Sequence, residues 1–419
     1  MIFNRIILTG SLLVAVLPAY AVAPTNEEIW QKLQQIQEQL SEVQQQNKLL
    51  KAENEGLKLQ VDSNEKLAQE ATETAEAVAV ATEEAVKNVS LKGNKMSIGG
   101  YGELHFNSLD DQNGTADKDE IDFHRFVLFF DYDFTEQLRF VSELELEHSI
   151  AGDGQAGAIE LEQAYIEYDI NKRLRVAGGL FLVPAGINNE MHEPTTFYGT
   201  ERNPIEKNII PTTWREAGVM LSGNIVNGFS YDLAVSSGLN TSASSAYKVR
   251  SGRQGVAQAV AKDFAYTGRL KWTAIPGLEL AATVQYQQDI TQSLDSTAGS
   301  ATLLETHAVF ERGSFGLRAL YATWDLEGNC PKSMGADEQM GWYIEPSYRF
   351  NDNVGIFARY NEWDNQAGNS SDSEYQQTDI GINWWPHHDV VVKLDYQLQK
   401  APAGKKELDG LNIGLGYQF

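Results

Sequence analysis

The alternation of apolar and polar side chains is strictest in residues 411–419 at the C-terminus. A β-strand places alternate side chains on opposite faces, so this segment predicts a strand with one apolar face. Because the chain ends on an aromatic residue of this strand, we expect it to be the last strand of a closed barrel. The edge strand of a soluble β-sandwich is the alternative. The alternating residues are Leu411, Asn412, Ile413, Gly414, Leu415, Gly416, Tyr417, Gln418 and Phe419.

The same alternation recurs from residue 97 to the C-terminus, in about sixteen segments of strand length. Short connections rich in Gly, Pro, Asn or Asp alternate with long connections without a break. An outer-membrane barrel has this arrangement, with short turns in the periplasm and long loops outside, whereas a sandwich has no reason for it. The expected strands are 97–108, 121–132, 138–148, 160–169, 174–183, 216–223, 229–238, 264–273, 278–288, 302–310, 314–324, 340–350, 354–363, 375–385, 390–399 and 410–419. The fold class is therefore an all-β transmembrane barrel of antiparallel strands, over residues 96–419.

The first part of the chain predicts export and then a helix. Arg5, an apolar run and small residues predict a signal peptide over residues 1–21, cleaved after Ala21. Residues 27–67 carry an apolar seam spaced alternately by four and three, which predicts a self-associating α-helical coiled coil. Residues 68–95 read as a linker of low complexity. The seam positions are Ile29, Leu33, Ile36, Leu40, Val43, Asn47, Leu50, Asn54, Leu57 and Val61.

An even strand number places both ends of the barrel in the periplasm, so we expect the coiled coil there too, with the barrel in lipid of the bacterial outer membrane. Aromatic residues make up 10% of the chain, as two interfacial girdles require. The formal net charge of −25 excludes a nucleic-acid binder. Because Cys330 is the single cysteine, no intrachain disulfide is expected.

A barrel of about sixteen strands has a lumen wide enough for water, so function is expected where something narrows it. The longest connection, 184–215, is the candidate. Its aromatic and proline content favours a packed loop that folds inward, and a surface loop is the alternative. Charged groups at a constriction would set ion preference. The constriction candidates are Glu190, His192, Glu193, Glu201, Arg202, Glu206, Lys207 and Arg215.

The segment Gly179-Leu180-Phe181-Leu182-Val183-Pro184-Ala185-Gly186 resembles the Gly-x-Phe-x-x-Pro-x-Gly signature of the phosphate-selective porin O and P family. Residues 201–204 and 215–219 are similar to the exit of that family's third loop. The resemblance spans residues 96–419 and implies a trimeric, sixteen-stranded outer-membrane channel. Members best known for phosphate use an arginine ladder, which cannot be traced here residue by residue. The candidates for lumen-facing charges are Arg125, Arg139, Glu143, Glu145, Glu147, Arg175, Arg318 and Arg359.

No catalytic constellation is legible, because His307 has no Ser or Asp partner at a recognisable spacing. His387 and His388 fall in a turn and read as polar turn residues rather than a metal site. We therefore expect no enzyme, cofactor or resident metal. The acidic balance favours a general porin for passive diffusion of ions and small hydrophilic solutes. Two alternatives stay open: an anion- or phosphate-selective channel, and a tether whose coiled coil contacts peptidoglycan and holds the outer membrane to the cell wall.

Overall fold

The computed structural model describes residues 95–114 and 116–419, together with single positions between 26 and 66. The chain divides into two units, Met1–Leu91 and Lys92–Phe419. In the first unit, the described positions are all helical and exposed. The signal peptide, all ten seam positions and nearly all of the linker lie outside the described residues. No helix in the described part of the chain is long and apolar enough to cross a bilayer.

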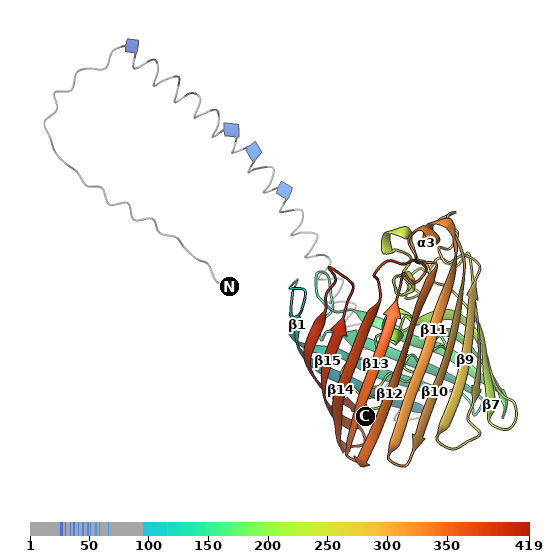
Figure 1. Ribbon diagram of the computed structural model, residues 1–419. Coiled ribbons are helices and arrows are strands. Elements are labelled where there is room, and N and C mark those ends of the chain that lie inside the picture. The colour runs from blue at the N-terminus through green and yellow to red at the C-terminus, as the bar shows by residue number, and fades with distance from the viewer. Residues whose placement is uncertain are drawn as a thin grey trace. The chain divides into compact units, whose positions relative to one another are not determined.

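The second unit is a closed antiparallel barrel in which every strand pairs with its neighbours in sequence (Figure 1). The last strand pairs with the first, with Leu415 opposite Leu104 and Ile413 opposite Phe106. The predicted barrel and its closure are therefore confirmed. The strands are β1 (Met96–Asp111), β2 (Lys118–Asp133), β3 (Leu138–Glu147), β4 (Ile159–Asn171), β5 (Leu174–Leu182), β6 (Arg215–Asn224), β7 (Phe229–Ser236), β8 (Ala265–Trp272), β9 (Leu278–Gln287), β10 (Ala298–Arg312), β11 (Phe315–Gly328), β12 (Glu338–Asn351), β13 (Val354–Asp364), β14 (Tyr375–His387), β15 (Val390–Lys400) and β16 (Leu408–Gln418).

Short turns gather at one rim of the barrel and long loops at the other, as the alternation of connection lengths predicts. Gly100 and Phe419 exchange backbone hydrogen bonds of 3.0 and 2.9 Å, so both ends of the barrel lie at the short-turn rim. Figure 1 shows helix α3 (Asn329–Ser333) at the long-loop rim. The other short helices, also in long loops, are α2 (Ile205–Asn208), η1 (Ala243–Ser245) and η2 (Val249–Gly252).

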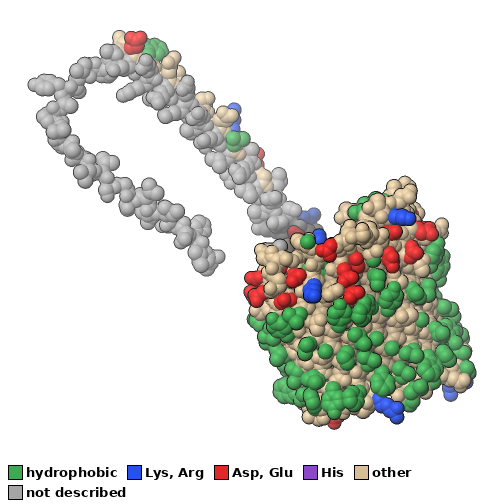
Figure 2. Space-filling view, in the orientation of Figure 1, with side chains coloured by type: hydrophobic (Ala, Val, Ile, Leu, Met, Phe, Trp, Pro, Cys, Tyr) green, Lys and Arg blue, Asp and Glu red, His purple; other side chains and the backbone are tan. Residues whose placement is uncertain are grey.

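The barrel is apolar outside and polar inside. Leu233 and Val235 on β7 are 52% and 45% exposed on the outer face, whereas inward residues such as Asn361 and Glu305 are fully buried. Figure 2 shows hydrophobic side chains in a broad band across the face of the barrel in view, with acidic side chains above it toward the long-loop rim. Such a band suits the acyl chains of a bilayer, where closed pairing also leaves no backbone edge unsatisfied.

The loop of residues 183–214, between β5 and β6, lies inside the barrel. Its apolar side chains Ile205, Ile209 and Trp214 are buried in one cluster with inward side chains of β10–β13, among them Trp324. The indole Nε1 of Trp324 donates a hydrogen bond of 2.9 Å to the carbonyl oxygen of Ile209. Burying these side chains stabilises the folded loop by roughly 1.5–3 kcal/mol each. The loop therefore occupies part of the lumen, against one wall.

Candidate functional site

A cavity of about 310 Å³ lies toward the long-loop rim, between β1–β4, the loop 183–214 and the loop 237–264. We call it the mouth cavity. Charged side chains of both signs line it, and they come from two sources. The strands contribute Glu103, Arg125, Glu145, Glu147, Glu160, Glu162 and Arg215, and the loops contribute Glu201, Arg202, Glu206, Lys207, Arg250 and Arg253.

The basic residues that the strands contribute are paired with carboxylates. The Nε of Arg125 lies 2.5 Å from Glu103 and 3.9 Å from Glu145, on neighbouring strands. Arg215 forms an ion pair with Glu160 and lies 3.8 Å from Glu162. Pairing of this kind stabilises both arginines, and the strand side as a whole brings five glutamates against two arginines to the cavity.

The basic residues of the two loops form no ion pair with a carboxylate of the described residues. Arg250 donates to the carbonyl oxygens of Lys207 and Thr212, at 3.0 and 2.9 Å. Arg253 donates to Thr213 at 3.2 Å, and Arg202 donates to the hydroxyl of the same residue, also at 3.2 Å. We call Arg202, Lys207, Arg250 and Arg253 the loop cations.

The loop cations crowd one another. Burial, and after it the charge of Arg253, lowers the pKa of Arg250 to about 10. Burial and the charge of Arg215 likewise lower the pKa of Arg253. Both arginines stay protonated at neutral pH, so the loop side of the mouth cavity carries positive charge that no ion pair among the described residues neutralises.

The loop 183–214 brings two carboxylates to this cavity, those of Glu201 and Glu206, and a histidine lies against Glu201. Its carboxylate lies 3.4 Å from Nδ1 of His105 and 3.9 Å from Lys118. Burial favours the neutral acid, but the attraction of His105 and its hydrogen bond outweigh that effect and hold the pKa of Glu201 well below its usual range. Glu201 is therefore ionised and held against β1 rather than against the loop cations.

A second cavity, of about 280 Å³, lies at the short-turn rim, and basic residues outnumber acidic ones in its lining. Arg269 is paired there with Asp232 at 2.7 Å and with Glu190 of the inward loop. The Nε of Arg139 donates to Glu167 at 2.6 Å, and Arg175 shares that carboxylate at 3.5 Å. The charged lining residues are Asp169, Lys172, Arg173, Arg175, Asp232, Arg269 and Lys271.

The eight constriction candidates are not brought into one ring. Glu201, Arg202, Lys207 and Arg215 line the mouth cavity, Glu190 pairs with Arg269 near the other rim, and Glu193 is partly buried and lines neither cavity. The candidates are separated because the loop extends from near one rim of the barrel to near the other. Glu206 also lines the mouth cavity although the residue is buried, and the remaining candidate, His192, is buried too.

His192 and Glu206 hold the loop in place rather than presenting a free charge. The Nε2 of His192 lies 3.2 Å from Glu143 and 3.5 Å from Glu162 on the wall. The carboxylate of Glu206 accepts hydrogen bonds from the backbone N–H groups of Ile187 and Asn188, at 2.6 and 2.5 Å. Buried charges need such partners, so we assign both residues to the loop's internal support.

The eight candidates for lumen-facing charges all lie on the inner face. Arg359 and Arg318 donate to carbonyl oxygens of the inward loop, at Tyr198 and Thr196. Glu143 contacts His192, and Arg125, Glu145 and Glu147 line the mouth cavity. Arg139 and Arg175 share Glu167 near the short-turn rim.

Sequence reasoning missed three features of the mouth cavity. Arg250 and Arg253 enter it because the loop 237–264 also packs inward, and no local pattern marks that. Glu162 faces inward because it is an extra residue of β4: Gln163 pairs with Glu143 and Leu161 with Leu144. Beyond a bulge of this kind, the side chains that point inward shift by one position, so strict alternation predicts the wrong face of the barrel. His105, His124 and His148 reach the cavity in the same part of the wall.

A closed sixteen-strand barrel with an apolar outer face, a charged interior and a loop folded into the lumen defines an outer-membrane channel of the porin class. The sequence profile of a known family, described as phosphate-selective porin O and P, matches residues 98–419. The chain belongs to this family, as the resemblance at residues 179–186 implies.

Relatives and solved structures agree with that assignment. An uncharacterised protein of Aquifex aeolicus (strain VF5) is 30% identical over 354 residues, covering 77% of this chain and 80% of that protein. The anion-selective porin from Comamonas acidovorans has a TM-score of 0.56 at 13% identity, covering 77% and 99% of the two chains. The channel DcaP of Acinetobacter baumannii has a TM-score of 0.54, also at 13% identity, covering 77% and 97%. At these identities the solved structures share the fold alone.

Proposed function

We propose that this outer-membrane porin passes small anions in preference to cations, and that the loop cations set this preference. The observation that carries the proposal is that Arg202, Lys207, Arg250 and Arg253 line the mouth cavity without a carboxylate partner among the described residues. A solute that enters from the long-loop side meets this positive surface. Uncompensated charge in a narrow aqueous region raises the local concentration of the opposite ion.

The acidic surplus of the whole chain is no argument against an anion path, because inward acidic residues are engaged by cations. Arg359 lies 3.2 Å from Glu345 and 3.0 Å from Asp379. Lys271 lies 3.5 Å from Glu279, and His307 contacts both Glu279 and Glu305. The net charge of −25 counts these paired groups and the exposed acidic residues of the outer loops alike. A general porin with cation preference, which the composition favours, is the alternative.

Unsatisfied donors among the loop cations support the proposal. Nε and Nη2 of Arg202, and Nε of Arg253, are buried and have no acceptor in the protein. Guanidinium groups prefer planar, multidentate contacts with oxyanions. The description of the family names phosphate, so phosphate is the first oxyanion to test.

The test is the reversal potential of the purified full-length protein in a planar bilayer, under a gradient of potassium chloride and then with phosphate added. We expect a sign that reports chloride preference, and a lower chloride conductance when phosphate occupies the loop cations. A reversal potential that reports potassium preference would overturn the proposal in favour of the general porin. A protein that conducts no ions would leave the tether as the better description of its role.

We also propose that the chain assembles as a homotrimer and that residues 27–67 form a coiled coil in the periplasm. The wall is lowest at β5–β9, whose strands have 8–10 residues against 14–16 in β1, β2 and β10–β12. A low wall suits contact with neighbouring subunits.

The helical state of the described positions between 26 and 66 supports the coiled coil. Native mass spectrometry of the full chain and of a chain lacking 27–67 would test both proposals, and envelope blebbing caused by that deletion would support a tether to peptidoglycan.

A further inference from the structure

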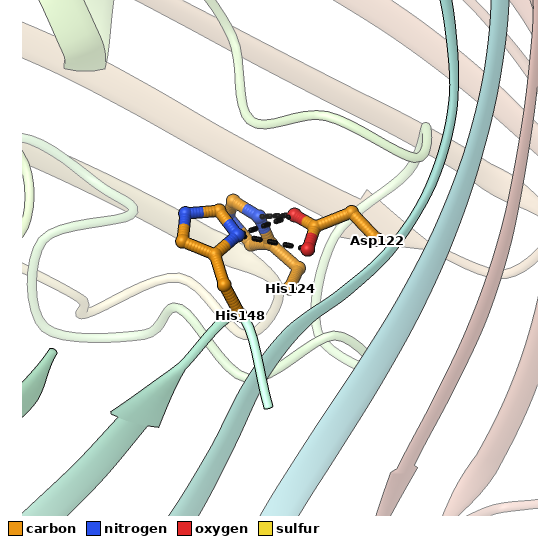
Figure 3. Close-up of side chains that lie close together, drawn as sticks. All are labelled: Asp122, His124 and His148. Carbon is orange, nitrogen blue, oxygen red and sulfur yellow. Dashed lines mark hydrogen bonds and ion pairs between the residues drawn. The ribbon is translucent and has the colours of Figure 1, made fainter. Parts of the chain in front are cut away.

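Three of the seven histidines in the chain converge on one part of the mouth cavity, and the proposed anion path uses none of them. Asp122 and His124 lie on β2, and His148 directly follows β3. Figure 3 shows the two imidazole rings turned toward the carboxylate of Asp122. His105 stacks against His124, with ring centroids 4.6 Å apart and the rings inclined by 12°.

Two irregularities of the backbone bring these side chains together. Glu103 pairs with Arg125 and His105 with Asp122, so Phe123 and His124 lie opposite Leu104 alone. This bulge turns Asp122 to the inner face although Arg125, three residues later, also points inward. Bulges recur next to functional sites because they redirect side chains in this way.

The second irregularity is at His148, whose φ of 52° lies in the left-handed region that few residues other than glycine adopt. Its backbone N–H donates a hydrogen bond of 3.2 Å to the carbonyl oxygen of His124, which holds the two residues side by side. Strained conformations of this kind persist where the surrounding structure imposes them, and they gather at binding sites. The bulge in β2 and the left-handed backbone at His148 therefore both contribute to bringing Asp122, His124 and His148 together.

The distances suit a metal ion. The Nδ1 of His148 lies 2.8 and 2.9 Å from the two carboxylate oxygens of Asp122, and the Nδ1 of His124 lies 3.2 Å from Oδ2. The three ligand atoms lie within 4.8 Å of one another. Zinc bonds to nitrogen and oxygen at about 2.0–2.2 Å, so neighbouring ligands of a tetrahedral site are separated by about 3.3 Å.

We propose that Asp122, His124 and His148 bind a divalent transition-metal ion of the zinc class at the mouth of the channel. Two imidazoles and one carboxylate form a donor set typical of zinc, nickel or copper, and unlike the all-oxygen sets that magnesium prefers. The cavity supplies the open fourth position, where water or a passing anion binds. His105 is a positioning residue, since its own nitrogens face Glu103 at 3.2 Å and Glu201 at 3.4 Å while its ring supports that of His124.

Metal binding would replace the hydrogen bonds between the two imidazole rings and Asp122. Without metal, each Nδ1 that faces the carboxylate donates a hydrogen bond to Asp122, and the ion replaces these hydrogens with coordinate bonds. Each ring keeps its one hydrogen on Nε2 when Nδ1 binds the ion. The bound ion adds positive charge to the cavity that the loop cations line, so occupancy changes conduction when metal is added from the long-loop side.

Calorimetric titration of the purified full-length protein with zinc chloride tests the site. Three variants are compared with the wild type: His124→Gln with His148→Gln, Asp122→Asn alone, and His387→Gln with His388→Gln. The last variant is the matched control, because His387, His388 and Asp389 form another cluster of candidate ligands, in an exposed turn at the opposite rim. Heat-modifiable migration in gels and circular dichroism establish that each variant is folded.

We expect the wild type and the turn variant to bind zinc with similar affinity and to bind magnesium hardly at all. The double variant at the mouth should lose about a hundredfold in affinity or more, since even neighbours of metal ligands are worth about 10–100-fold. Cobalt added in place of zinc should give the visible absorption of a four-coordinate ion. Equal binding by the wild type and the mouth variant, or loss of binding only in the turn variant, would overturn the proposal. These readouts do not depend on ion selectivity, so they stand whether or not the channel prefers anions.

Discussion

The two sides of the mouth cavity carry charge in different ways. On the strand side, Arg125 pairs with Glu103 on the adjacent strand β1, and Arg215 on β6 pairs with Glu160 on β4, across β5. On the loop side, Arg202, Arg250 and Arg253 donate to backbone carbonyls or a hydroxyl. Pairs within the wall stabilise a closed barrel and add little field, whereas the loop cations leave their charge available to a solute.

The difference has a physical origin in how each side is built. Adjacent strands hold opposite side chains about 5 Å apart, so a charge on one strand selects an opposite charge on the next. A loop folded into the lumen has backbone carbonyl oxygens that no strand ladder engages, and these accept from arginine without neutralising it. We therefore expect substitutions of loop charges to change ion selectivity, and substitutions of strand charges to change the stability of the barrel.

The largest effect is expected from removing loop cations. Arg202→Gln, Arg250→Gln and Arg253→Gln together should lower the ratio of anion to cation permeability more than tenfold. Two unit charges about 6 Å apart in water interact by about 0.7 kcal/mol, which is about threefold for each charge removed. The measurement is the reversal potential of the triple variant in a salt gradient.

The matched control for this variant is Lys332→Gln, because Lys332 is an exposed cation on α3 outside the mouth cavity. It should leave the permeability ratio unchanged. If the triple variant also keeps the wild-type ratio, the loop side does not set selectivity and the comparison between the two sides fails.

An intermediate effect is expected from loosening the loop that carries two of the loop cations. Glu206→Ala removes the acceptor of the N–H groups of Ile187 and Asn188 and leaves them buried without a partner. The docked loop should lose about 1–3 kcal/mol, so that it leaves the wall more often. Single-channel recordings should show a larger and noisier conductance with weaker ion preference.

Glu193→Ala serves as the control for Glu206→Ala, since Glu193 lies on the same loop, is partly buried and lines neither cavity. Its recordings should match those of the wild type. If the Glu206 variant shows the same conductance noise as the wild type, apolar packing around Trp324 and Ile209 is enough to hold the loop.

The smallest effect is expected at the contact between the loop and the wall through His192. Burial alone would lower the pKa of His192, but hydrogen bonds and attraction to Glu143 and Glu162 outweigh burial and raise it well above the ordinary value. The stabilisation is therefore fully present below about pH 6.5, the ordinary pKa of a free histidine, and is lost as the pH rises through the raised pKa.

The measurement is conductance noise across an alkaline titration of the wild type and of His192→Gln. Noise should rise at alkaline pH in the wild type, whereas the variant should be noisier already at neutral pH and change little. His387→Gln, in an exposed turn, should follow the wild type. An alkaline rise that persists unchanged in the His192 variant would assign the titration to another group.

The strands were predictable because lipid imposes a simple rule on them. Alternation placed the predicted segment 354–363 within a residue of β13, and Val354 to Trp363 pairs with β14 without irregularity. The prediction failed to assign Glu162 and His124 because a bulge beside each one changes which face the next residue occupies. Whether a bulge forms depends on the partner strand, so no pattern within β2 or β4 reveals it.

The inward course of the loop 183–214 was accessible from its apolar and aromatic content, but the role of each charged residue was not. Glu206 and Lys207 are adjacent in sequence, yet the carboxylate is buried among backbone N–H groups while the ammonium is exposed at the mouth cavity. Arg250 and Arg253 carry no local signal at all, because their place in the cavity depends on contacts with Thr212 and Thr213, more than thirty residues earlier.

The sequence by itself determined the class of this protein: a chain whose alternating strands close into an outer-membrane barrel, since a bilayer tolerates no unpaired backbone edge. Only the tertiary structure decided which charges are free to act. Net charge counts every ionised group equally, but a charge influences a solute only when no opposite charge lies against it. That depends on register, on two bulges and on loops that meet inside the lumen, which are long-range contacts rather than local patterns.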